Sequence, residues 1–425
     1  MRGGRGGRDV LQRRMPSAPD STTSDAQASV SGSTRARTWR DPVVMLMLLT
    51  VANQLCFQTW FTLINNFAHG PAGFGGREIG ILQTVREIPG FLSFGAVLVL
   101  LLMREQTLVY LALAVLSLGT LLAGFFPSEY PLYATTLVFS TGFHYFEPVK
   151  NSLLMQWVPR EDTARQLGRV ISAESFGALA AFGLVYATFT LAGLGYIGTY
   201  AVAAAGTLAL LIAVMLAYPY FPQTVRQHQH IVLRRRYWLY YVLTLLEGAR
   251  RQIFVVFASF MMVERFGYSV TAITTLYLVN QLFTMLVAEK VGGMVIRFGE
   301  RAALWLEYVG LAVVFTAYAF VRDPIIACGL YMIDNVFFGL AMATQTYFRK
   351  IADPADIAPT SAVAFSINHV AAVVLPATLG HVWEKSPAAV FLTGSVLAVC
   401  SILLGVLIPR RPAPGHEIAW VGRGG

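Results

Sequence analysis

Long apolar stretches follow one another along almost the whole chain. About 20 apolar residues are enough for a helix to cross the hydrocarbon core of a membrane. Short segments rich in Gly, Pro, Ser or Asp separate the stretches, as is usual between helices. Twelve stretches can be counted: 43–67, 79–103, 107–126, 131–157, 164–192, 197–219, 237–263, 268–295, 302–321, 325–348, 358–383 and 387–408. The pattern predicts an all-α membrane protein with twelve transmembrane helices.

Composition agrees with this pattern. Hydrophobic residues make up 56% of the chain and charged residues only 13%, whereas soluble proteins average about 25% charged. The mean hydropathy is +0.58. A soluble domain of this size has too little polar surface to cover so many apolar side chains, which excludes a soluble enzyme, a coiled coil and a disordered scaffold as the main body. Cys56, Cys328 and Cys400 lie inside apolar stretches without disulfide or metal-site spacing.

Basic residues outnumber acidic ones, 32 to 23, which gives a net charge of +9. In a membrane protein such an excess belongs to the cytoplasmic loops, so we expect no nucleic-acid partner. If the N-terminus is inside, 23 Lys and Arg residues fall in the tails and inner loops. The outer loops hold four: Arg77, Arg265, Arg322 and Lys385. The bias predicts a multi-pass protein of a bacterial-type inner membrane with both termini in the cytoplasm.

The same pattern divides the chain into five parts. Residues 1–41 are rich in Arg, Gly, Ser and Thr, and we predict a disordered basic cytoplasmic tail. Residues 42–219 and 237–408 are expected to form two six-helix bundles. The linker 220–236 contains His228, His230 and three consecutive arginines. We interpret the arginines as signals that fix the topology, and lipid headgroups as a plausible contact beside that role. Residues 409–425 form a second cytoplasmic tail.

The two predicted bundles superpose at a constant offset of about 195 residues, the layout of two parallel six-helix repeats. Pro159 then falls on Pro354, and Glu161 falls on Asp356. Glu174 and His369 also become equivalent positions.

Two local motifs carry a resemblance to a known family. The segment Gly292-Gly-Met-Val-Ile-Arg297-Phe-Gly299-Glu-Arg301 resembles the Gly-x-x-x-Asp-Arg-x-Gly-Arg-Arg loop of the major facilitator superfamily, with Ile296 at the Asp position. Pro159-Arg160 through Arg169 resembles the family's connection into span five. The first-half loop motif, expected near Met103-Arg104, is absent. The drug-antiporter signature of span five is also absent, and Ala173, Gly177 and Ala181 stand there with spacing suited to packing against span eight. The resemblance implies a cavity built from helices one, four, seven and ten, and transport by alternating access.

Charged residues inside the predicted helices are the candidate functional groups. A charge at the bilayer centre costs about 2.5–3.5 kcal/mol on insertion scales, so it needs a partner or a watery cavity. With a rise of about 1.5 Å per residue, six ionisable residues fall near mid-membrane. They are Glu87, Glu147, Glu174, Glu247, Asp334 and His369. We predict that they surround a site at the midplane.

The candidate substrate-binding residues lie on the helices that the resemblance assigns to the cavity. They are Asn53, Gln54, Gln58, His144, Glu147, Lys150, Glu247, Arg250, Arg251 and Asp334. On span four, Glu147 and Lys150 are also spaced to form a structural ion pair. On span seven, Glu247 can reach both arginines, which lie about 100° apart on the helix. Glu247 can then neutralise one arginine, which leaves the other for an anionic group.

Other charged residues are assigned to proton coupling and gating. The proton-coupling candidates are Glu87, Glu174 and His369, because Glu and His change charge between wet and dry surroundings. The gating candidates are Arg86, Arg297 and Arg301. Arg86 and Glu87 are adjacent, so we expect them to point to different sides and to need partners on another helix, such as span eleven. Fixed structural pairing, or a histidine satisfied within the core, is the alternative.

The sequence shows no phosphate-binding glycine loop, no metal-ligand spacing and no nucleophile with a base. We predict a secondary transporter rather than an enzyme, monomeric in the lipid bilayer, without a metal or cofactor. Its substrate should be a small polar, anionic or zwitterionic solute, and its driving ion the proton. The alternatives are efflux of hydrophobic drugs by proton antiport, and a transport-dead receptor or assembly factor with the same fold.

Overall fold

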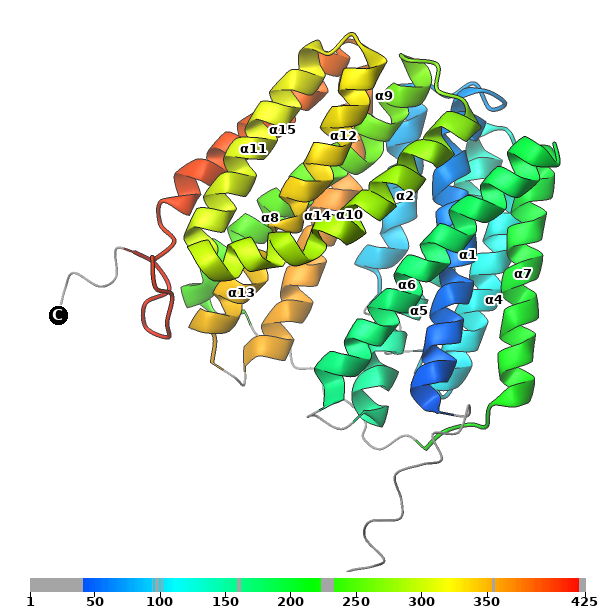
Figure 1. Cartoon of the computed structure of the whole chain (residues 1–425), viewed down its shortest axis with the longest axis horizontal. Coiled ribbons are helices and arrows are strands. Elements are labelled where there is room, and N and C mark those ends of the chain that lie inside the picture. Colours follow the sequence, from blue (N-terminus) through cyan, green and yellow to red (C-terminus); the bar gives the residue numbers. More distant parts are fainter. Residues whose placement is uncertain are drawn as a thin grey trace, which may run out of the picture. The chain divides into compact units, whose positions relative to one another are not determined.

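A computed structural model describes residues 41–93, 95, 99–100, 102–158, 162–222, 233–353 and 356–419 (Figure 1). The predicted N-terminal tail, both linker histidines and Pro159-Arg160 lie outside these residues. The described chain from Pro42 onward forms one compact unit.

The first six predicted spans are all helical. Their elements are α1 (Pro42–His69), α2 (Gly76–Phe91), α4 (Glu105–Ala123), α5 (Glu129–Trp157), α6 (Thr163–Val185) continued by η2 (Tyr186–Leu191), and α7 (Gly195–Ala217). The α5 helix contains Pro148 and runs without interruption through it.

The second six spans are helical as well, with more interruptions. Their elements are η3 (Arg235–Tyr237), α8 (Trp238–Ile253), η4 (Phe254–Ala258), α9 (Ser259–Glu264), α10 (Val270–Phe298), α11 (Glu300–Phe320), α12 (Pro324–Gly339), α13 (Met342–Ile351), α14 (Ile357–Trp383) and α15 (Pro387–Gly405). Span seven therefore consists of α8, η4 and α9, and span ten of α12 and α13. The prediction of an all-α fold with twelve helical spans is confirmed.

Nine helical segments of the described chain are long and apolar enough to cross a membrane. Spans two, four and seven are not among them. These are the spans that carry Arg86 with Glu87, Glu147 with Lys150, and Glu247 with two arginines. Several candidate charges are therefore concentrated on these three spans, whereas Glu174, Asp334 and His369 lie on spans that are long and apolar enough.

The packing of the helices repeats between the two halves. In the first half α1 packs against α6 and α7, and in the second half α8 packs against α14 and α15. The halves meet where α2 packs on α14 and α6 packs on α10. Figure 1 shows α1, α4, α5, α6 and α7 on one side of the molecule, with α8 and α10 to α15 on the other.

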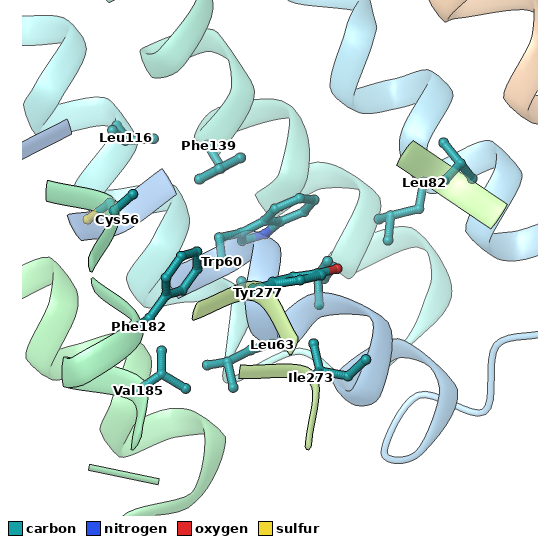
Figure 2. Packing of buried hydrophobic residues seen from close by; sticks show 14 of the residues in the cluster. Cys56, Trp60, Leu63, Leu82, Leu116, Phe139, Phe182, Val185, Ile273 and Tyr277 are labelled. Atoms are coloured by element: carbon teal, nitrogen blue, oxygen red, sulfur yellow. The ribbon is translucent and has the colours of Figure 1, made fainter. Parts of the chain in front are cut away.

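Large side chains around α1 form the core of the first half. Trp60 is fully buried and stacks on Phe139 of α5, with ring centroids 4.4 Å apart. Cys56 donates its thiol hydrogen to Thr207 of α7, 3.2 Å away. Figure 2 shows Phe182 of α6 and Tyr277 of α10 beside Trp60, so this core also reaches the second half.

The two halves are joined by hydrogen bonds on the side of the bundle where α1 ends. There the Asn65 amide donates to Ser259 Oγ, 3.0 Å away, and the Asn66 amide donates to the Tyr268 carbonyl, 2.7 Å away. The Thr84 hydroxyl of α2 donates to the Val373 carbonyl of α14 at 2.8 Å. These bonds close the interface between the halves at this side.

Two glycines allow α2 and α14 to cross in close contact. A Cβ atom at Gly380 would lie 2.6 Å from the Gly76 carbonyl oxygen and 3.1 Å from Gly80 Cα. A Cβ atom at Gly80 would collide with the Pro376 carbonyl. Larger residues at this crossing would hold the two backbones apart.

The prediction that the small residues of span five pack against span eight is wrong for Gly177. A Cβ atom there would lie 2.7 Å from Gln54 Cβ of α1. The four-residue spacing correctly indicated close packing, but it gave no direction around the helix.

Candidate functional site

A cavity of about 750 Å³ lies between the two halves. Its walls come from α1, α2, α5, α8, α13 and α14. It extends from Glu87 inside the bundle to Arg349 and Ile357, beside the α13–α14 connection on the side where α1 begins. A volume of this size is typical of a small-molecule site.

Seven of the sixteen predicted site residues line this cavity. They are Gln58, Arg86, Glu87, His144, Glu247, Arg251 and His369. The cavity wall also contains polar residues that were not among the predicted site residues, notably Thr344, Arg349 and Asn368.

At its inner end the cavity is bounded by a cluster of Arg86, Glu87, His144 and His369, called here the α2 cluster. An Arg86 guanidinium nitrogen lies 2.5 Å from Glu87 Oε1. The Nε2 atoms of His144 and His369 each lie 3.8 Å from Glu87 Oε2. The expectation that adjacent Arg86 and Glu87 cannot pair is wrong, because the long arginine side chain folds back onto its neighbour. The expected contact between span two and span eleven is present through His369.

Each imidazole of the α2 cluster is oriented by its own helix. His144 Nδ1 lies 3.1 Å from the Ser140 carbonyl oxygen, and His369 Nδ1 lies 3.0 Å from the Phe365 carbonyl oxygen. Ser140 Oγ also lies 2.8 Å from His144 Nδ1, and its own hydrogen is donated to the Arg86 carbonyl. The carbonyl oxygens only accept hydrogen bonds, so these contacts are satisfied when Nδ1 carries the hydrogen in both rings. Both Nε2 atoms therefore face Glu87.

The two arginines of span seven lie in different environments. Arg251 is exposed on the cavity wall, and none of the ion pairs among the described residues involves it. Arg250 is completely buried, lies 3.0 Å from Glu307 of α11 and donates to Ser401 of α15. One arginine of the two is therefore neutralised, as expected, but its partner is Glu307 rather than Glu247.

Glu307 is the charged residue that the sequence reasoning missed. It lies only five residues after the predicted start of span nine, which suggested a position close to the membrane surface. The α11 helix begins earlier, at Glu300, and its neighbourhood is covered by the C-terminal segment, where Ala419 donates to the Leu407 carbonyl. Glu307 is 0% exposed.

A second buried charge cluster lies within the first half. Lys150 Nζ lies 2.8 Å from Glu147 and 2.6 Å from Glu174 of α6. The predicted ion pair on span four is confirmed, and Glu174 joins it from span five. Glu147, Lys150 and Glu174 do not line the cavity.

The remaining predicted substrate-binding residues lie within the helix packing. Asn53 and Asp334 are 0% exposed, and their side-chain polar atoms have no hydrogen-bond partner among the described residues. Gln54 is buried and accepts a hydrogen bond from Gln58, which does reach the cavity.

The predicted gating residues Arg297 and Arg301 flank a connection of a single residue. Gly299 joins α10 to α11 with φ of +80°, a left-handed backbone that favours glycine. The neighbouring Glu300 forms an ion pair with Lys350 of α13 at 2.6 Å. Neither arginine lines the cavity.

The end of the linker is tied to α14 outside the membrane-spanning segments. Arg234 and Arg236 lie 3.2 and 3.0 Å from Asp356, and Tyr237 donates to the same carboxylate at 3.1 Å. Burial acts to raise the pKa of Asp356, but the hydrogen bonds from both arginines bring it below its usual value. Two of the three consecutive arginines at the end of the linker, Arg234 and Arg236, thus bind protein groups, beside the topological role expected for them.

Known structures of the same architecture match this chain over most of its length. The nucleoside transporter NupG matches with a TM-score of 0.69 at 15% identity, covering 85% of this chain and 98% of that chain. A bacterial homologue of the human lysosomal transporter Spinster, in an inward-facing and occupied conformation, matches with 0.64 at 14% identity, covering 87% and 96%. A POT family transporter in complex with 5-aminolevulinic acid matches with 0.67 at 12% identity, covering 86% and 95%. No curated protein sequence matches the chain significantly.

The family itself is shown by a sequence model. Residues 46–376, most of the twelve-helix body, match the model of the Major Facilitator Superfamily. The helical architecture, the two packed halves and the cavity between them agree with this match. The chain therefore belongs to the Major Facilitator Superfamily and is a multi-pass membrane transporter rather than an enzyme.

Proposed function

We propose that this transporter moves a small anionic or zwitterionic solute through the cavity between its halves. With neutral histidines, the cavity wall carries three positive charges, Arg86, Arg251 and Arg349, against two negative ones, Glu87 and Glu247, so its net charge is +1. Such a wall favours a solute with an anionic group.

The observation that carries this proposal is the free guanidinium of Arg251. Arg86 is bound to Glu87, whereas Arg251 reaches the cavity without an ion-pair partner among the described residues. A planar guanidinium suits bidentate binding of a carboxylate or phosphate. Glu247 lies on the same wall, one helical turn away, and can receive the cationic group of a zwitterion. The 5-aminolevulinic acid bound by one similar structure carries both kinds of group, which supports this substrate class.

The experiment compares Arg251→Lys with Arg250→Lys. Lysine has no planar fork, so Arg251→Lys should weaken binding of anionic or zwitterionic solutes about 10- to 100-fold. Solutes that raise the melting temperature of the purified protein identify the ligand, and titration then gives the affinity. The control Arg250→Lys changes the neighbouring residue on a helix face away from the cavity. Unchanged affinity in Arg251→Lys, in a variant that melts normally, contradicts the proposal.

We also propose the orientation that the basic loops indicate, with both termini in the cytoplasm of a bacterial-type cell. The cavity then extends toward the cytoplasm, and the hydrogen-bonded side of the bundle faces outward. Reporter fusions after Phe126 and after Pro219 should respond as outside and inside, respectively. The reversed pattern contradicts this orientation.

Proton coupling is proposed for the Lys150 cluster. Two carboxylates, Glu147 and Glu174, share one ammonium group, which leaves a net charge of −1 among membrane-buried groups. Binding of one proton makes the cluster neutral, which lowers the cost of burying it. The side chains of Glu147 and Glu174 are 29% and 33% exposed, so a proton can reach either carboxylate. Monomeric function is proposed as well.

A further inference from the structure

We propose that Glu87, His144 and His369 bind a transition-metal ion of the Zn²⁺ type at the inner end of the cavity. One potential ligand atom from each residue lies within 4.8 Å of the other two. The three residues come from α2, α5 and α14, so the ion would be held by both halves of the transporter. The sequence gives no metal-ligand spacing for this set, because the residues are far apart in the chain.

The orientation of the two imidazoles favours a metal ion. Hydrogen bonds from Nδ1 to backbone carbonyls leave the Nε2 lone pairs directed at Glu87 Oε2. This is how metal-binding histidines are usually held by their second ring nitrogen. Two nitrogen lone pairs and a carboxylate oxygen that face one another offer three ligand atoms to a cation.

The distances fit a metal ion better than a shared proton. Each Nε2–Oε2 separation is 3.8 Å, longer than a hydrogen bond of up to about 3.2 Å. Zinc bonds to nitrogen and oxygen are about 2.0–2.2 Å, so two ligand atoms of one tetrahedral ion lie about 3.3–3.6 Å apart, close to the 3.8 Å seen here. A small rotation of the side chains closes the widest separation.

The backbone of α2 leaves room for both rings. Gly90 lies one turn after Glu87, and a Cβ atom there would lie 2.5 Å from His369 Nε2 and 2.6 Å from His144 Cδ2. Any larger residue would push the imidazoles away from Glu87. The glycine therefore keeps the ligand atoms together, and the cavity gives an ion access to them.

Arg86 narrows the choice of metal. It occupies Glu87 Oε1, which leaves one carboxylate oxygen for the ion and adds a positive charge nearby. Hard ions such as Mg²⁺ and Ca²⁺ need several oxygen ligands, which this site lacks. Zn²⁺, Co²⁺ and Ni²⁺ bind well to imidazole, and water can complete their coordination.

The test measures metal binding by the purified full-length transporter, without solute or gradient. All variants carry His228→Ala and His230→Ala, which removes the linker histidines. Zn²⁺ should bind at one equivalent, measured by calorimetry, and Co²⁺ should give a d–d absorption band. Loss of a second-sphere partner alone costs 10- to 100-fold in affinity, so His144→Gln or His369→Gln should weaken binding at least about 100-fold.

The matched control is His381→Gln on the same helix as His369. The Nδ1 of His381 also bonds the carbonyl four residues earlier, but the ring is exposed and outside the cluster. Its loss should leave binding unchanged. If His369→Gln does not fold, His369→Cys keeps a ligand and should add a sulfur-to-Co²⁺ charge-transfer band.

Three results overturn the proposal. They are the absence of stoichiometric Zn²⁺ binding by the starting protein, unchanged binding in both glutamine variants, and the absence of the charge-transfer band in His369→Cys. Because no solute is present, these results are independent of whether Arg251 binds an anionic substrate.

Discussion

Arg250 and Arg251 are neighbours in the chain, yet one is buried between helices and the other faces a cavity. Their positions differ by about 100° around α8, and this rotation alone gives them different partners. Arg250 lies with its guanidinium carbon 4.8 Å from the centroid of the Tyr308 ring and forms its ion pair with Glu307. Arg250 therefore stabilises the second half, whereas Arg251 is available to a solute.

The Arg250–Glu307 pair gives a prediction about stability. Arg250→Ala leaves a buried carboxylate without its partner and should destabilise the protein by about 3–5 kcal/mol. Adding Glu307→Gln to Arg250→Ala should restore part of this loss, because it removes the stranded charge. Unfolding of the two single variants and the double variant gives the coupling energy.

Glu247→Gln is the control in that series. The sequence suggested Glu247 as the partner of one arginine, but the ion pair of Arg250 is with Glu307. Glu247→Gln should therefore rescue Arg250→Ala less than Glu307→Gln does. Equal rescue by both glutamine variants would contradict the partner assignment.

At the scale of helices, the interface between α2 and α14 depends on the absence of side chains. Gly80 and Gly380 allow the two backbones to touch on the side where α1 ends. Alternating access requires this side to open and the cavity side to close. The contact between α2 and α14 must therefore form and break during transport. The size of the residue at position 80 determines how closely the two helices approach when this side is closed.

Gly80→Val should shift the transporter toward the conformation that is open on the side where α1 ends. A valine collides with the Pro376 carbonyl when that side is closed, but not when α14 has moved away. Labelling of single cysteines at Asn65 and Asn66 should therefore become faster. Gly329→Val is the matched control, because a Cβ atom there meets nothing within 4 Å. The idea fails if both variants label at the same rate.

The sequence predicted every span because hydropathy is a local property. The twelve stretches place the described helices within a few residues, except that α2 ends at Phe91 and the predicted span two at residue 103. Gly299 shows how little separates two of the helices. Contacts between helices were harder to predict. In a membrane a helix is apolar on both its lipid face and its packing face, so polarity does not identify its neighbours. Gly177 was assigned to the wrong helix for this reason.

The same reason limited the prediction of the site. Depth along a helix was enough to select Glu87, Glu247 and His369, which line the cavity. Depth alone could not separate Gln58, which reaches the cavity, from Asn53, which is buried in the packing. Direction around the helix has to come from the tertiary structure.

At the scale of the whole molecule, buried charge is divided among separate places. The α2 cluster joins the two halves, the Lys150 cluster lies in the first half, and the Arg250–Glu307 pair lies in the second. Only the first of these lines the cavity. A change of proton occupancy in the Lys150 cluster must therefore act on the solute through movement of helices α5 and α6.

Glu174→Gln should separate solute exchange from accumulation. The variant cluster is neutral at every stage of transport, because one carboxylate and one ammonium remain. Reconstituted vesicles should exchange solute between equal pools at near the normal rate, but should no longer accumulate it along a proton gradient. Ser172→Ala, an exposed position on the same helix, is the control. Gradient-driven accumulation that survives in Glu174→Gln would remove this residue from coupling.

The three charged, weakly apolar spans also affect how the chain enters the membrane. Span seven carries Arg250 and Arg251 against Glu247 alone and leaves the ribosome well before α11 supplies Glu307, so during synthesis one of its two arginines has no carboxylate partner. Span four, in contrast, brings Glu147 and Lys150 together within one helix. We expect span four to integrate by itself and span seven to remain at the translocon or the membrane surface until α11 arrives. Insertion of the second half is therefore the sensitive step of biogenesis. If synthesis is slow or Glu307 is missing, span seven stays incompletely inserted for longer, and membrane quality control can recognise it.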